Sequence, residues 1–185
     1  MERIKIIFYV LTSFFGIEDG RIAADKTIIT IYPENKEIEI IQEGLFSIMQ
    51  TEKDSVLILQ QWNKLSELKE GHTHWSKELD SFPVKNFDFT PIKNTVQPHL
   101  ILKYSKEKDL RNLGIWYNEK KNQFSVNHIP QHNVKTSDGN LEGNYWIFNG
   151  ERKFSFTIEP FLEMPESYRK LKRPLEEYIS TLKKE

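Results

Sequence analysis

Short runs of β-branched and aromatic residues, each bounded by turn-forming residues, limit the folds open to this chain more than any other feature. In the clearest run Phe154, Phe156 and Ile158 alternate with Ser155 and Thr157. Alternation with a period of two is typical of a strand with one buried and one solvated face. Similar runs, separated by Lys, Asn, Asp and Gly, lie at 99–104, 113–117, 124–129 and 144–148. Their spacing predicts antiparallel strands joined by short turns.

A hairpin is predicted in the first part of the chain. Two β-branched segments, 26–32 and 37–41, flank the turn residues 33–36. Glutamate and isoleucine alternate in the second segment, so we expect one face of that strand to meet water.

The segment 45–68 is compatible with two interpretations. Residues 55–59 suit a further strand or the first turn of a helix capped by Asp54. Apolar residues recur at helical spacing later in the segment, at Ile58, Trp62, Leu65 and Leu68. We expect a strand that passes into a helix near Gln60.

A second helix is predicted at the C-terminal end, from Pro165 toward Lys183, with an interruption at Pro174. The pattern as a whole predicts an α+β fold. Its main part is an antiparallel, curved β-sheet or partial barrel, with the C-terminal helix and, as the alternative for 45–68, one mid-chain helix.

The stretch 72–97 contains Pro83 and Pro91, and Pro98 follows it directly. Single apolar residues are scattered among Ser, Asn and Asp, so we expect a long, largely irregular connection. Long loops in compact domains are often functional, which makes this segment a region of interest.

Length and composition predict one globular domain over residues 1–185. The 26 basic and 27 acidic residues give a formal net charge of -1, so no nucleic-acid partner is expected. The chain has no cysteine, which rules out disulfides, thiolate zinc sites and cysteine nucleophiles within it. A cysteine-free chain suits any redox compartment, and a cytoplasmic location is slightly favoured over export.

Residues 1–16 have two interpretations. Arg3 and Lys5 precede the apolar run 6–15, as in a signal peptide. The small residues required at a cleavage site are poorly placed, and the run is β-branched and aromatic enough for a core strand, which we favour. It is too short for a membrane-spanning helix of about 20 residues, so no transmembrane segment is expected.

Motifs for known chemistry are scarce. The chain has no Gly-x-Ser-x-Gly elbow, no phosphate-binding glycine loop and no dinucleotide fingerprint, so we assign no catalytic residue and no cofactor. Two histidine pairs, His72 with His74 and His128 with His132, have spacings compatible with metal ligation. A pair is only half of a typical zinc site, and loop histidines without a ligand are the simpler interpretation.

Aromatic residues give a further lead. In Trp116-Tyr117 and Tyr145-Trp146, adjacent side chains on a strand point to opposite faces, so one of each pair is expected in the core. With Trp62 and Trp75, they are also suited to line a concave apolar pocket. The candidate ligand-binding residues are Trp75, Trp116, Tyr117, Tyr145 and Trp146.

These features favour a non-enzymatic binding or protein-interaction domain that recognises another protein or a small apolar ligand. A neutralising partner of another protein is a narrower form of this hypothesis. One alternative is a metal-dependent hydrolase that uses His72 and His74. Another is an exported envelope protein that loses residues 1–16 and binds a small apolar ligand.

Overall fold

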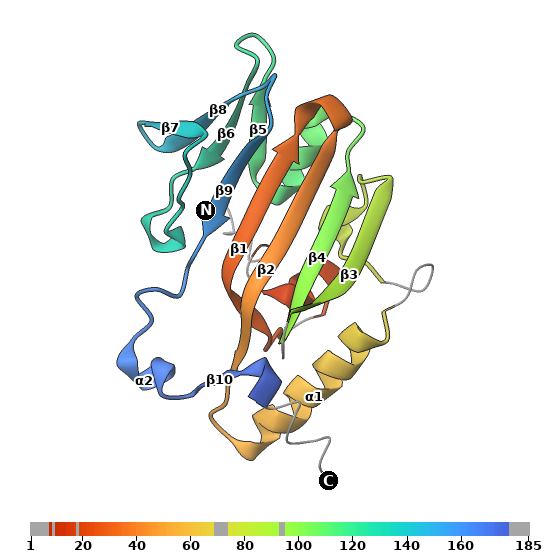
Figure 1. Ribbon diagram of the computed structural model, residues 1–185, viewed down its shortest axis with the longest axis vertical. Coiled ribbons are helices and arrows are strands. Elements are labelled where there is room, and N and C mark those ends of the chain that lie inside the picture. The colour runs from red at the N-terminus through yellow and green to blue at the C-terminus, as the bar shows by residue number, and fades with distance from the viewer. Residues whose placement is uncertain (1–7, 9, 18, 69–73, 93–94, 178–185) are drawn as a thin grey trace.

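The computed structural model describes residues 8, 10–17, 19–68, 74–92 and 95–177 and shows an α+β fold with two antiparallel sheets and a long helix (Figure 1). The predicted fold class is confirmed. The strands are β1 (Ala23–Tyr32), β2 (Glu37–Ile48), β3 (Val84–Ile92), β4 (Thr95–Lys103), β5 (Ile115–Asn118), β6 (Gln123–Asn127), β7 (Gly139–Glu142), β8 (Tyr145–Asn149), β9 (Phe154–Ile158) and β10 (Lys172–Pro174). The α-helices are α1 (Glu52–Ser66) and α2 (Glu166–Arg169), and the 3-10 helices are η2 (Leu11–Phe15), η3 (Pro33–Asn35), η4 (Lys77–Leu79), η5 (Glu107–Leu113) and η6 (Pro130–His132).

Sheet A has the strand order β3-β4-β2-β1-β9, and β10 pairs with the end of β2. Its centre is the predicted hairpin, β1 and β2, whose turn includes Lys36 in the left-handed region at φ 50°. The register pairs Ile29 with Ile40 and Ile31 with Ile38, and all four side chains are buried. The alternating glutamates of β2 therefore lie on the opposite face, as predicted.

The expectation of an irregular connection over 72–97 is wrong for its second half. β3 and β4 form a hairpin in which Phe87 and Phe89 alternate with exposed residues. Prolines concealed this pattern. Pro91 lies on β3, an edge strand where proline is tolerated, and the pairing of β4 with β2 ends at the residue next to Pro98.

Sheet B has the order β5-β6-β8-β7. Three of its strands match predicted runs, whereas β7 covers part of a stretch expected to form a turn. The next strand, β9, returns to sheet A and pairs with β1. On β9, Phe154 lies 4.4 Å from Phe148 and 5.3 Å from Phe124 of sheet B, measured between ring centroids. β9 therefore joins the two sheets to one hydrophobic core.

Helix α1 resolves the ambiguity over 45–68. Residues 55–59 lie within α1, so the expected strand that passes into a helix near Gln60 is wrong, and the alternative of a helix that includes this segment is confirmed. β2 ends at Ile48, and α1 begins at Glu52. Thr51 is the N-cap, and Asp54 completes a capping box from the third position of the helix. Ile58 and Leu65 are buried, so the helical spacing seen in the sequence marks the face that packs on the core.

The N-terminal segment packs in the core without forming the expected strand over its described part. Leu11–Phe15 is the 3-10 helix η2, and Leu11, Phe14 and Phe15 are buried. In Figure 1 this red segment lies behind sheet A. Val10 makes a single bridge to Ala23, and residues 1–7 and 9 lie outside the described residues.

The predicted C-terminal helix is present but divided. α2 ends at Arg169, β10 follows, and helical backbone resumes at 175–177 beyond Pro174, where the interruption was predicted. The expected course toward Lys183 lies outside the described residues. Over the described part of the chain, no helix combines the length and the apolar character needed to cross a membrane.

Candidate functional site

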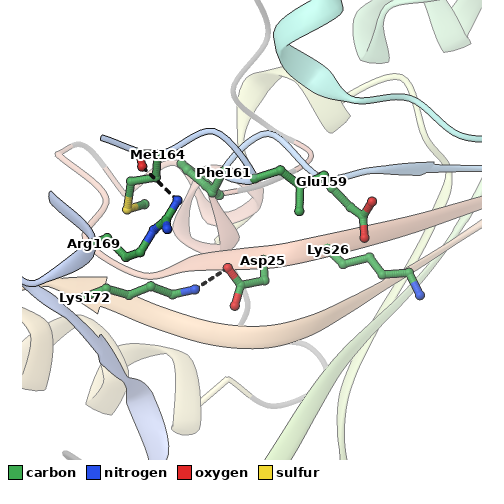
Figure 2. Close-up of a pocket in the computed structure, with 8 residues that line it drawn as sticks. Asp25, Lys26, Glu159, Phe161, Met164, Arg169 and Lys172 are labelled. Carbon is green, nitrogen blue, oxygen red and sulfur yellow. Dashed lines mark hydrogen bonds and ion pairs between the residues drawn. The ribbon is translucent and has the colours of Figure 1, made fainter. Parts of the chain in front are cut away.

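A pocket of about 420 Å³ lies between the start of β1 and the connection from β9 to β10 (Figure 2). The segments that form it are far apart in the sequence and meet because β9 and β10 both return to the β1–β2 hairpin. Its lining residues are Asp25, Lys26, Glu159, Phe161, Leu162, Met164, Arg169 and Lys172.

Three neighbouring residues of the connection supply the apolar part of the pocket. The ring of Phe161 packs edge-on against Phe46, with 5.1 Å between the ring centroids, so this part of the lining is anchored to β2. Met164 is half-buried, whereas Leu162 is 53% exposed although it lines the pocket. The Leu162 side chain therefore exposes apolar surface to water, and a ligand in the pocket would bury that surface.

The charged part of the pocket centres on the contact between Asp25 and Lys172. The Lys172 ammonium donates to Asp25 over 2.5 Å and lies 4.3 Å from the centroid of the Phe46 ring. A Cβ at Gly44 would lie 3.1 Å from the Cβ of Asp25, and Gly44 has a φ of 66°. Glycine at this position therefore allows the Asp25 side chain to lie over the neighbouring strand.

Arg169 is the most loosely held cation of the lining. One guanidinium nitrogen donates to the carbonyl of Met164 over 3.2 Å, and another lies 3.7 Å from the Glu166 carboxylate. Both side chains of this ion pair are more than half exposed, so water weakens it. Arg169 thus retains donors in a planar geometry that suits a carboxylate.

The remaining charges on the rim are paired. Lys26 lies 3.1 Å from Glu43, and Glu159 forms an ion pair with Lys135. Figure 2 shows Lys26 and Glu159 at one end of the pocket and Arg169 with Lys172 at the other. An occupant would meet an apolar surface between charged ends, so the chemistry suits an amphipathic group more than a purely apolar one.

The structure divides the aromatic candidates among different surfaces. Tyr117 and Trp146 pack against the core, and their neighbours Trp116 and Tyr145 lie on the opposite face of sheet B. The predicted alternation within each pair is confirmed. Trp75 lies elsewhere and packs on Phe15 with 5.2 Å between ring centroids. A role of these residues in ligand binding stays a prediction.

The histidine candidates are also separated. His72 lies outside the described residues, and His74 is exposed. The His128 ring lies edge-on to Trp146, 6.1 Å between centroids, and burial lowers the pKa of His132. Among the residues with described positions, no group of three or more His, Cys, Asp or Glu is arranged to hold a metal ion.

Sequence reasoning missed the pocket residues. The second part of the connection 159–171 falls in the segment predicted to begin the C-terminal helix at Pro165, and Asp25 and Lys172 are 147 positions apart. It also passed over His99, whose ring nitrogen lies 2.8 Å from the Glu39 carboxylate on the outer face of sheet A. The glutamate alternation of β2 was the available signal, because it predicts a solvated face lined with carboxylates that accept hydrogen bonds.

Comparisons of the chain with protein-family models, with curated proteins and with solved structures gave no match.

Proposed function

We propose that this chain is a non-enzymatic protein-binding domain that docks its partner over the pocket between β1 and the connection 159–171. The observation that carries the proposal is the exposed Leu162, which lines the pocket together with Met164 and Arg169. The lining combines three apolar residues with five charged ones. Aromatic residues, methionine and arginine are enriched in protein interfaces, and the core of such an interface is apolar. Phe161, which also lines the pocket and packs on Phe46, adds an aromatic residue to this composition.

The dimensions of the pocket support one anchoring side chain of the partner. Binding pockets for small groups span about 300–1,000 Å³, and the volume of about 420 Å³ lies near the lower end. A partner that inserts an apolar side chain against Phe161 and Met164 would also cover Leu162. The charged rim would then fix the orientation of the partner, with Arg169 facing an acidic group.

The test uses variants of the site on a partner recovered from the native host. Native mass spectrometry first identifies a stoichiometric protein partner, and the Kd is then measured for Leu162→Glu and Arg169→Glu. We expect Leu162→Glu to weaken binding about 30-fold, which corresponds to a loss of about 2 kcal/mol at a central contact. Val56→Glu is the matched control, because Val56 on α1 is 55% exposed and Leu162 is 53% exposed.

An unchanged Kd in both site variants, or an equal loss in the Val56 control, would contradict docking at the pocket. Native spectra without any stoichiometric protein would contradict the function itself. A neutralising role toward an enzyme or toxin is a narrower form, supported if the recovered partner loses its activity in the complex.

The two alternatives stay predictions. A metal-dependent hydrolase needs both His72 and His74, and only His74 belongs to the described residues. An exported form depends on removal of residues 1–16, which is tested by the truncation described below.

A further inference from the structure

The face of sheet B that points away from the core has a regular layout. The register places Trp116, Ser125, Ile147 and Asn140 in one row across β5, β6, β8 and β7. Tyr145 lies two positions before Ile147 on β8, hence on the same face, and is 48% exposed. Trp116 and Ile147 belong neither to the hydrophobic core nor to the half-buried side chains packed on it. This face therefore directs the exposed ring of Tyr145 and the half-buried side chains of Trp116 and Ile147 away from the core.

A polar strip runs through the middle of this face along β6. Gln123, Ser125 and Asn127 share the face because they alternate with two residues that point to the core. Strands in a sheet lie about 4.8 Å apart, so the strip separates Trp116 on β5 from the side chains of β8 by about 10 Å. A hydrogen-bonding surface is thus bordered by Trp116 on one side and by Tyr145 with Ile147 on the other.

The face is almost without charge. Glu142, at its edge on β7, is the only charged residue that the four strands direct to this side. The outer face of sheet A differs, because ion pairs such as Lys103 with Glu37 and Lys26 with Glu43 cross it. A charged ligand on sheet B would lose hydration without gaining a partner of opposite sign. The charge pattern therefore complements an occupant that is itself uncharged.

Amide and aromatic groups together define the chemistry of that occupant. A side-chain amide offers both donors and acceptors, which is what neighbouring hydroxyl groups require, and an indole or phenol ring offers a flat apolar surface with a polar edge. A saccharide carries hydroxyl groups around its rim and C–H groups on its ring faces. We propose that this face binds a neutral saccharide, with Trp116 and Tyr145 against ring faces and Gln123 and Asn127 on hydroxyl groups.

Native affinity electrophoresis of the full chain tests this site, in gels that contain a soluble neutral glucan, xylan or mannan. We expect one of these polysaccharides to retard the wild-type protein. Trp116→Ala and Tyr145→Ala should each raise the Kd for that polysaccharide, measured from the retardation, at least tenfold. Tyr168→Ala is the matched control, because Tyr168 and Tyr145 are both 48% exposed. Because no ion pair is involved, added salt should leave the retardation unchanged.

Three outcomes would overturn the proposal: no retardation in any of the gels, retardation of Tyr145→Ala equal to wild type, or retardation that salt abolishes. Tyr145 is 48% exposed and lies outside the hydrophobic core, so its variant keeps the test decisive even if Trp116→Ala fails to fold. The result is independent of the protein-binding pocket, since the two surfaces share no residue.

Discussion

Gly44 shows how one position shapes the candidate pocket. Its φ of 66° is a left-handed conformation that costs other residues about 1–2 kcal/mol. A Cβ there would also come within 3.1 Å of the Cβ of Asp25, the partner of Lys172. Glycine at this position therefore keeps both the strand and the charged part of the pocket in place.

We predict that Gly44→Ala lowers the free energy of unfolding by about 1 kcal/mol more than Gly114→Ala. Gly114 has a φ of 77°, and a Cβ there would meet no atom within 4 Å, so its variant isolates the backbone strain. Urea unfolding of both variants gives the comparison. Equal losses would show that the side chain of Asp25 moves aside without cost.

Side chains could be assigned to faces from the sequence only where the pattern is local. The alternation of Trp116 with Tyr117 follows from neighbouring positions, and it was predicted. The contact of Asp25 with Lys172 joins residues 147 positions apart, and no periodicity within either segment indicates it. The pocket depends on contacts of this second kind, which is why it could not be predicted.

The edge strand β3 is protected against pairing with other chains. The N–H of Tyr104 donates to the carbonyl of Lys36 next to β2, so the odd-numbered residues of β4 donate toward β3. The alternate residues of β3 then turn their N–H groups to the free edge. Two of these positions are blocked, because the Phe89 N–H donates to Asp88 over 2.7 Å and Pro91 has no N–H.

We predict that the double variant Asp88→Ala, Pro91→Thr associates at high concentration, because it opens two more donors for an added strand. Asn86→Ala is the control, since its N–H faces β4 and the substitution opens no donor. Size-exclusion chromatography with light scattering measures the mass over a range of concentrations. A monomeric double variant under all conditions would show that other features guard this edge.

Elements with strong local signals were predicted well. The β1–β2 hairpin and the runs that became β5, β6, β8 and β9 combine alternation with turn residues, and α1 shows helical spacing. β3 was missed, because Pro91 and the nearby Pro98 mask its alternation of aromatic and polar residues. The cap of α1 was placed at Asp54, because serine, threonine and aspartate all suit that position, and only the backbone geometry distinguishes Thr51.

The two sheets share one core, and the distribution of the strands between the two sheets could not be derived from the sequence. Each predicted strand carries information about its faces but none about its neighbours across the sheet. A simple meander would have placed β9 beside β8, whereas β9 pairs with β1. Pairing of distant strands is decided by packing of whole faces, such as Phe154 on Phe124 and Phe148.

We predict that deletion of residues 1–16 abolishes cooperative unfolding. The deletion removes Leu11, Phe14 and Phe15, all buried, and the loss of one buried large apolar side chain already costs about 2–5 kcal/mol. Thermal unfolding followed by circular dichroism, with the intact chain as control, measures the effect. A truncated protein that unfolds cooperatively near the temperature of the intact chain would instead support an exported form without this segment.

The pairing of β9 with β1 also bears on how the chain acquires its structure during synthesis. Ser155 on β9 donates to the carbonyl of Ile29 on β1, across 126 positions of the chain. Until β9 has left the ribosome, the edge of β1 that will pair with β9 is unpaired, and strands of other nascent chains can pair with it. Pairing over such distances slows folding into the range of milliseconds to seconds. We therefore expect the yield of folded protein in cells to depend on chaperones that hold the chain during translation.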